Sequence, residues 1–200
     1  MLAETGGNMQ DEGIALYRRF LNGDVKSLET LISLYRQNLF RFICGYVYDE
    51  ALAEDIMQET FLALYYKRTF KPRDDVSFKT YLYTIARNKS LNAVKKRKRE
   101  VSLETLIENN TEAKQPVSHT PSAQENIERA EKEIMVQEAM QKIKADYREV
   151  LQLRYFEELP PEKIAKVTGR NTKQVYNLLS RGRVALKELL NEEGIENEEF

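Results

Sequence analysis

Apolar residues recur at helical spacing along most of this 200-residue chain, and no long stretch alternates between apolar and polar residues. Residues three and four positions apart share one face of an α-helix, whereas a strand needs a period of two. One apolar stripe in the first half consists of Leu52, Ile56, Met57, Thr60, Phe61 and Leu64. Another, near the end, consists of Val175, Leu179, Gly182, Leu186 and Leu189. The spacing therefore predicts an all-α protein.

One stretch interrupts the helical pattern. Residues 102–122 are mostly polar and include Pro116 and Pro121. This composition is typical of a linker, and helical spacing resumes near Ala123. We therefore expect two small helical domains, residues 11–99 and 123–191, joined by a flexible linker over residues 100–122.

Composition restricts the class of protein further. With 42% hydrophobic and 32% charged residues, the chain has enough apolar material for packed cores and a strongly polar surface. No apolar run approaches the roughly 20 residues that span a bilayer, and the N-terminus lacks the basic-then-apolar pattern of a signal peptide. The single cysteine, Cys44, excludes an intramolecular disulfide and suits a reducing compartment. We expect a cytoplasmic protein without direct membrane insertion.

A basic segment ends the first predicted domain. The formal net charge of the chain is −1, yet residues 87–99 hold seven basic residues and no acidic one. A helix over residues 77–99 would bury Phe78, Leu82, Ile85 and Ala86. At 100° per residue, a separate sector roughly 60° wide holds Tyr81, Asn88, Asn92, Lys95 and Arg99.

That sector has the chemistry of a nucleic-acid-binding face. Cations hold phosphates, amides bond base edges, and an aromatic ring stacks on an unpaired base. The alternative is a polar surface helix whose terminal cations suit the helix dipole. The five consecutive basic residues at 95–99 exceed what that alternative requires, so we favour nucleic-acid binding.

Residues 161–183 have the spacing of a helix-turn-helix. A small residue, Ala165, allows two helices to cross closely, and Gly169 supplies a turn with positive φ. Val175 and Leu178 then pack the second helix against the first. Asn171 and Gln174 have the spacing of a capping box. The alternative is an ordinary helical hairpin with a tight turn.

The outward side of the second helix carries amide, hydroxyl and basic side chains. Amides suit adenine, whereas a guanidinium group suits guanine or phosphate. The candidate DNA-binding residues are Lys173, Asn177, Ser180, Arg181 and Arg183.

Four segments, taken in order, resemble one family. They are AEDIMQETF at 53–61, YLYTIARN at 81–88, KKRKR at 95–99 and PEKIAKVTGRNTKQVYNLLSRGR at 161–183. Together they resemble the ECF-type (extracytoplasmic-function) sigma factors, the small promoter-recognition subunits of bacterial RNA polymerase. The resemblance spans about residues 11–190 apart from the linker, which would replace the middle domain of larger sigma factors. It departs from the family pattern at Pro160, Pro161 and Gly182.

The resemblance assigns a polymerase-binding role to the segment at 53–61. Periodicity alone indicates only a solvated acidic face made of Asp55, Gln58, Glu59 and Leu62. In the family, a D-x-x-Q-E pattern docks on the clamp helices of the largest polymerase subunit, and Asp55, Gln58 and Glu59 match it. Carboxylates suit arginine partners, and Leu62 adds an apolar anchor.

The resemblance also assigns the two DNA-binding surfaces. The helix at 77–99 and the loop before it would melt the minus-ten element, with Asn88 contacting a flipped base and residues 70–77, beginning at Phe70, forming the pocket wall. A tryptophan often stands at the position of Tyr81, and this chain has none. The second helix of the helix-turn-helix would read the minus-thirty-five element.

The partners implied are core RNA polymerase, promoter DNA and, as in many family members, an anti-sigma factor; no cofactor, metal or catalytic residue is expected.

A free-standing helix-turn-helix regulator is the alternative, but it leaves the faces of Asp55 and Asn88 unexplained. A nuclease would need clustered metal-binding or acid–base groups. The only histidine, His119, lies in the linker, Cys44 lies on an apolar helix, and no partner motif accompanies the adjacent Asp74 and Asp75.

Overall fold

The structure is a computed structural model that describes residues 5–67, 77–104, 136 and 138–192. The regular elements within these residues are all helical, which confirms the all-α prediction. The first domain contains α1 (Thr5–Leu21), α2 (Val25–Val47), α3 (Glu50–Lys67) and α4 (Phe78–Glu104). The second contains α6 (Ala145–Leu151), a π-helical turn (Gln152–Phe156), α7 (Pro161–Thr168) and α8 (Thr172–Glu192). None of the helices described is long and apolar enough to cross a membrane.

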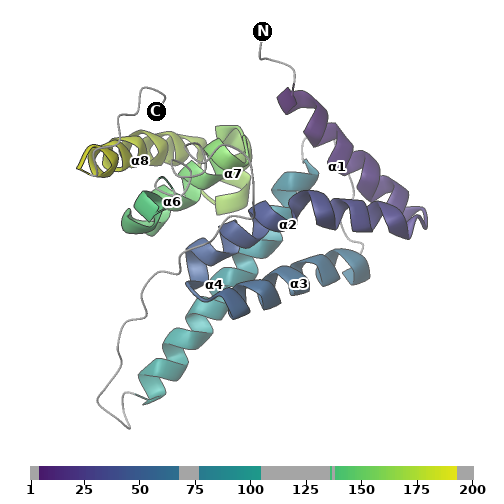
Figure 1. The fold of residues 1–200 in the computed structure, drawn as a ribbon, viewed down its shortest axis with the longest axis horizontal. Coiled ribbons are helices and arrows are strands. Elements are labelled where there is room, and N and C mark those ends of the chain that lie inside the picture. Colours follow the sequence, from purple (N-terminus) through teal and green to yellow (C-terminus); the bar gives the residue numbers. More distant parts are fainter. Residues whose placement is uncertain (1–4, 68–76, 105–135, 137, 193–200) are drawn as a thin grey trace, which may run out of the picture.

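Helix α2 is the centre of the first domain (Figure 1). It contacts α1, α3 and α4, and the same domain also brings α4 against α1 and α3. Aromatic side chains make much of this core: the ring centroids of Phe42 and Tyr83 lie 5.0 Å apart in an edge-on arrangement, and those of Tyr35 and Phe78 lie 5.5 Å apart. The domain is therefore a packed scaffold for the outer faces of α3 and α4.

The predicted inward stripes of this domain are confirmed. On α3, Ile56, Met57, Thr60, Phe61 and Leu64 are buried and Leu52 is half-buried. On α4, Phe78, Leu82 and Ala86 are buried and Ile85 is half-buried. Cys44 is buried, as expected, and burial raises the pKa of its thiol to about 12.

The helix-turn-helix of the second domain is also confirmed in its local details. Gly169 ends α7 with φ 69° and ψ 20°, the left-handed conformation that glycine adopts at least cost. The backbone N–H of Gln174 donates to Oδ1 of Asn171 at 2.8 Å, and the N–H of Asn171 donates to Oε1 of Gln174 at 2.9 Å. This reciprocal pair is the predicted capping box, and it starts α8 at a defined residue.

The departures from the family pattern fit the structure. Pro161 occupies the first turn of α7, where a missing N–H breaks no helical hydrogen bond. Gly182 is buried where α8 crosses α6: a Cβ atom at this position would lie 3.2 Å from Cβ of Tyr147 and 3.2 Å from Cδ1 of Leu151. Glycine therefore allows a closer approach of the two helices than a larger residue would.

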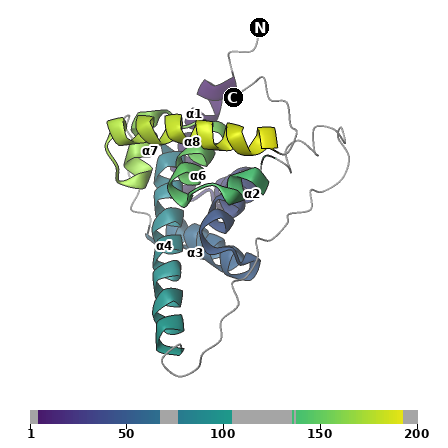
Figure 2. The ribbon, with the colours of Figure 1, turned by 90° about the vertical axis from the view of Figure 1, so that its left-hand side faces the viewer.

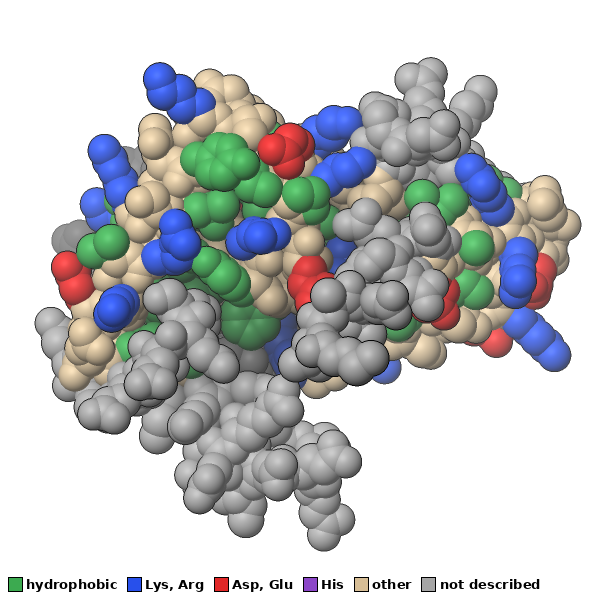
Figure 3. Space-filling view, turned by 90° about the horizontal axis from the view of Figure 1, so that it is seen from above, with side chains coloured by type: hydrophobic (Ala, Val, Ile, Leu, Met, Phe, Trp, Pro, Cys, Tyr) green, Lys and Arg blue, Asp and Glu red, His purple; other side chains and the backbone are tan. Residues whose placement is uncertain are grey.

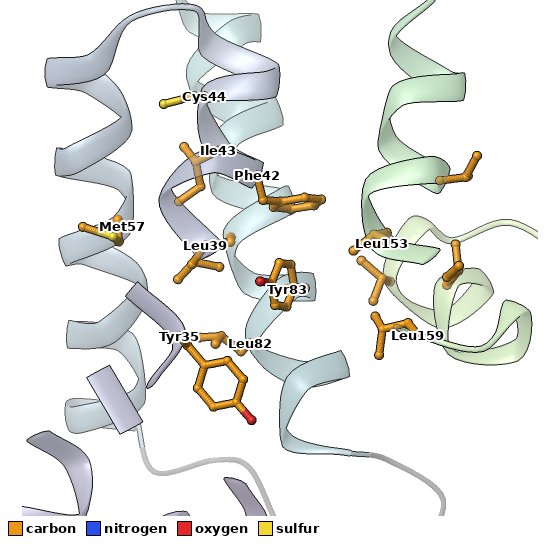
Figure 4. Packing of buried hydrophobic residues seen from close by; sticks show 14 of the residues in the cluster. Tyr35, Leu39, Phe42, Ile43, Cys44, Met57, Leu82, Tyr83, Leu153 and Leu159 are labelled. Atoms are coloured by element: carbon orange, nitrogen blue, oxygen red, sulfur yellow. The ribbon is translucent and has the colours of Figure 1, made fainter. Parts of the chain in front are cut away.

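The two domains pack directly against each other. Helix α7 contacts α4, and α6 contacts α2. Figure 4 shows Leu153 and Leu159 of the second domain on the side that faces Phe42 and Tyr83 of the first. Helix α4 continues to Glu104, so residues 100–104, which were predicted to begin the linker, are helical. The remaining linker and Phe70 lie outside the described residues.

Enlarging Gly182 should destabilise the second domain. We expect Gly182→Val to lower the free energy of unfolding by about 1–3 kcal/mol, because the added methyl groups overpack the contact with Tyr147 and Leu151. Urea and thermal denaturation would measure the change. The matched control is Glu188→Val on the exposed side of the same helix, which should change stability by about 0.5 kcal/mol or less. Equal losses in both variants would contradict the overpacking explanation.

Candidate polymerase and nucleic-acid interfaces

The outer face of α3 carries the predicted polymerase-binding residues. Asp55, Gln58, Glu59 and Leu62 are all exposed, and Leu62 keeps 50% of its surface accessible. The opposite side of the helix is packed into the core, so these side chains are held outward. Tyr66, one turn beyond Leu62, is 74% exposed and extends the same face. Sequence reasoning missed Tyr66, although its spacing of four from Leu62 could have indicated it.

Glu59 connects this face to α4. Its carboxylate lies 2.6 Å from Nζ of Lys89, which follows Asn88 in the chain. Nearby, the carboxylate of Glu54 lies 3.1 Å from the guanidinium group of Arg36, and the Gln58 amide donates to it at 3.5 Å. The acidic face is therefore part of a surface network that braces α3 against its neighbours.

The outer face of α4 carries Asn88, Asn92, Lys95 and Arg99, all exposed as predicted. In both ribbon views the C-terminal part of α4, with the basic run at 95–99, projects beyond the other helices (Figures 1 and 2). Two of its other cations lie near acids: Lys96 is 3.8 Å from Glu100, and Arg97 is 3.8 Å from Asp49. The predicted face is thus one continuous, accessible surface.

Tyr81 differs from the rest of that face. Its side chain is half-buried and packs against the hydrophobic core. Core contacts hold the ring in place, but they leave only part of it accessible to a base. The geometry therefore allows a fixed, partial stacking platform at this position.

The outer face of α8 carries Lys173, Asn177, Ser180, Arg181 and Arg183, all exposed as predicted. Figure 3 shows the upper face of the molecule, where basic side chains and exposed hydrophobic side chains are interspersed. Two apolar residues belong to the same helical sector: Tyr176 is 55% exposed and Val184 is 56% exposed. Sequence reasoning missed both, although Val184 stands four residues after Ser180. An exposed apolar side chain suits the methyl group of thymine.

Arg170 lies in the turn between α7 and α8. Its guanidinium group is 2.6 Å from the carboxylate of Asp146 and also pairs with Glu149. Both acids belong to α6, so these contacts tie the turn to the preceding helix. The arrangement orients the N-terminal end of α8, the end that carries Lys173. Sequence reasoning gave no role to Arg170, because the pairing joins residues more than 20 positions apart.

Family models match both domains. Residues 31–100 match the model of sigma-70 region 2, and residues 133–186 match that of sigma-70 region 4. The first match contains α3 and the outer face of α4 up to Arg99, and the second contains the helix-turn-helix.

Curated relatives cover both domains at once. The chain is 28% identical over 170 residues to the ECF RNA polymerase sigma factor SigM of Bacillus subtilis, a match that covers 82% of this chain and 96% of SigM. It is 31% identical over 163 residues to the RNA polymerase sigma factor YlaC of the same organism, covering 80% of this chain and 90% of YlaC. A free-standing regulator would not explain similarity along nearly the whole length of these proteins.

The fold agrees with these matches. The structure resembles the sigma factor RpoE of Bartonella quintana, solved in complex with the anti-sigma factor NepR, with a TM-score of 0.62 and 24% sequence identity. That likeness covers 84% of this chain and 98% of RpoE. With both domains matched in order, and with relatives aligned over more than four fifths of their own length, the chain belongs to the ECF-type RNA polymerase sigma factors.

Proposed function

We propose that this sigma factor uses three separate surfaces. The outer face of α3 binds core RNA polymerase, the outer face of α4 recognises and melts the minus-ten element, and the outer face of α8 reads the minus-thirty-five element. The observation that carries the proposal is the exposure of three chemically distinct faces, each on a helix whose opposite side is packed. Their order along the chain is that of regions 2 and 4 in the family models.

The α3 face combines charge with apolar anchors. Asp55 and Glu59 can accept charge-assisted hydrogen bonds from basic groups of the polymerase. Leu62 and Tyr66 supply exposed apolar surface beside them. Large side chains that become fully desolvated carry most of the affinity at interfaces, so this mixture suits docking better than a solvated acidic face would.

The α4 face combines base contacts with phosphate contacts. Extruding a base from the duplex costs a few kcal/mol, and stacking returns roughly 1–3 kcal/mol per base. Because Tyr81 is half-buried, its stacking alone does not offset that cost. Hydrogen bonds from Asn88 and Asn92, phosphate contacts from Lys95 and Arg99, and contacts with polymerase supply the rest.

The α8 face reads duplex DNA. The position of its N-terminal end, which carries Lys173 and Asn177, is fixed by the capping box at Asn171 and by the turn at Gly169. Asn177 suits adenine, Arg181 suits guanine or phosphate, and Val184 suits the thymine methyl group. Lys173 and Arg183 position the helix on the phosphate backbone.

The remaining assignments follow from this function. The two functional domains are residues 11–99 and residues 123–191. Residues 100–122 connect them, and this connection begins with the last residues of α4. Sigma factors are generally non-catalytic regulators of transcription, and we assign no enzymatic activity to this chain. Its partners are core RNA polymerase, promoter DNA and an anti-sigma factor of the kind that NepR is for RpoE. We infer a cytoplasmic location, because core RNA polymerase and promoter DNA are found there.

Reversing one charge and removing one apolar anchor on the α3 face should weaken polymerase binding. We expect Asp55→Lys combined with Leu62→Ser to weaken binding to core RNA polymerase at least tenfold, because a carboxylate and an apolar anchor are lost together. Glu59 is left intact because its pairing with Lys89 braces α3. Fluorescence anisotropy with labelled sigma factor would measure the affinity. The control Glu29→Lys makes the same charge change on the exposed side of α2 and should leave affinity unchanged. Wild-type affinity in the double variant would refute the docking role.

Two substitutions on α4 should separate base reading from phosphate binding. We expect Asn88→Ala to reduce open-complex formation and to relax base preference in the minus-ten element. Lys95→Ala should instead weaken binding to all sequences alike, because phosphate contacts carry no sequence information. Permanganate footprinting on a consensus promoter and on altered ones would measure both effects. If Asn88→Ala opens every promoter as well as the wild type does, the base-reading role is wrong.

Removing two contacts on α8 should affect only promoters with an upstream element. Each lost base contact costs roughly 1–3 kcal/mol, so Asn177→Ala combined with Arg181→Ala should reduce initiation at least tenfold. Run-off transcription with and without a minus-thirty-five element would locate the loss. A pre-melted minus-ten bubble should restore activity only in part, since the bubble does not replace upstream contacts. Glu188→Gln, on the same helix, is the control. An equal loss on DNA without the upstream element would exclude α8 as its reader.

A further inference from the structure

One lysine lies between the face of α3 that is proposed to bind polymerase and the face of α4 that is proposed to bind DNA. Nζ of Lys89 on α4 donates to Oε2 of Glu59 on α3 at 2.6 Å. The two side chains keep 29% and 62% of their surface accessible, so both groups can be reached by a partner. The pair therefore joins two surfaces that different partners are expected to cover.

Glu59 belongs to the outer face of α3, together with Asp55 and Gln58. A guanidinium group binds a carboxylate most strongly when it donates to both oxygens at once. One of these oxygens, Oε2, already accepts from Lys89. Two cations on one carboxylate also repel each other. An arginine of core polymerase that binds Glu59 through both oxygens therefore displaces the Lys89 ammonium group.

Lys89 borders the nucleic-acid face of α4. It follows Asn88 in the chain, and at 100° per residue it lies about 60° from Asn92 around the helix axis. Its flexible stem lets the ammonium group turn toward either neighbouring surface. Lys95 and Arg99, which are exposed on the same helix, already make this face suitable for phosphate binding. A Lys89 side chain released from Glu59 is thus free to bind a phosphate of the same strand.

The exchange changes the charge at the edge of the DNA-binding face. While Lys89 and Glu59 are paired, their charges cancel, and Lys89 attracts a phosphate only weakly. When a cation of polymerase neutralises Glu59, the charge of Lys89 is no longer cancelled. Exposed ion pairs change an equilibrium constant by only about fivefold or less. This pair is therefore weak enough to be given up when polymerase binds.

We propose that Lys89 changes partner during promoter recognition. In the free protein it pairs with Glu59, and in the complex with core polymerase it binds a phosphate at the minus-ten element. Polymerase and DNA then favour each other's binding through one side chain, because the group that binds Glu59 releases Lys89. This inference rests on the proposed function of the two faces. If the pair only braced α3 against α4, breaking it would weaken binding to both partners.

Lys89→Met should affect the two partners in opposite directions. It frees both oxygens of Glu59 and should lower the Kd for core polymerase about twofold to fivefold, as expected for the loss of one competing exposed pair. The holoenzyme made with this variant should bind promoter DNA less tightly. The slope of log K against log salt concentration should fall in magnitude by about 0.7–0.9, because one phosphate contact is lost.

Fluorescence anisotropy would measure both affinities. The DNA probes are labelled promoter fragments that the wild-type holoenzyme selects from genomic DNA. Lys89→Arg keeps a cation at this position and should retain the wild-type salt slope. Lys26→Met makes the same charge change as Lys89→Met on the exposed side of α2, and it should leave both affinities unchanged.

The free protein tests the DNA contact without polymerase. Glu59→Gln removes the carboxylate that holds Lys89 and should raise the affinity for a short labelled oligothymidine strand about twofold to fivefold. Adding Lys89→Met should abolish that gain. Glu29→Gln makes the same charge change on the exposed side of α2 and should give no gain at physiological salt, because charges more than about 8 Å away are largely screened.

Unchanged or weaker polymerase binding by Lys89→Met would overturn the proposal, and so would an unchanged salt slope of its holoenzyme. Equal gains in oligothymidine binding by Glu59→Gln and Glu29→Gln would also overturn it. Failure of the proposed function has a different signature. In that case Asp55→Lys combined with Leu62→Ser leaves polymerase binding intact, or the wild-type holoenzyme selects no promoter fragments.

Discussion

The burial of one face of α2 holds the first domain together. Leu31, Leu39, Phe42 and Ile43 lie on this face and are fully buried, and α1, α3 and α4 pack around them. Because α3 and α4 both bury an apolar stripe against the same core, their rotation about their own axes is determined. The polar residues between the stripes must then point outward. The proposed docking and melting surfaces are thus a consequence of how the core is packed.

The contact between the domains has a different physical character. Within each domain the core is mainly apolar, whereas the junction buries Lys79, Glu149 and Glu157, and the half-buried Arg87 pairs with Glu149. Burial raises the pKa of the Glu157 carboxyl, and the nearby Lys79 cation opposes that rise. Charges in such a place contribute little net attraction, but they tolerate few other arrangements. The junction therefore favours one relative placement of the two domains over others.

Local signals predicted most of the candidate sites. The Asn171–Gln174 capping box and the positive φ of Gly169 were both predicted, because each depends on residues within a few positions of one another. Exposed apolar residues at the ends of the recognised faces were missed: Tyr66 and Val184 are apolar and would ordinarily be assigned to a core. Whether an apolar side chain is covered depends on the neighbouring helices, and periodicity does not identify those neighbours.

The sequence by itself determined the helices, their inward and outward faces, and the family. Helical spacing, caps and turn residues depend on side chains only a few positions apart, so they can be recognised from the sequence alone. Only the tertiary structure decided how the faces are joined. The pairing of Lys79 with Glu157 spans 78 residues, and that of Tyr46 with Glu149 spans 103. Nothing local selects one carboxylate over another at such separations; the packing of α6 and α7 on α2 and α4 brings these charges together.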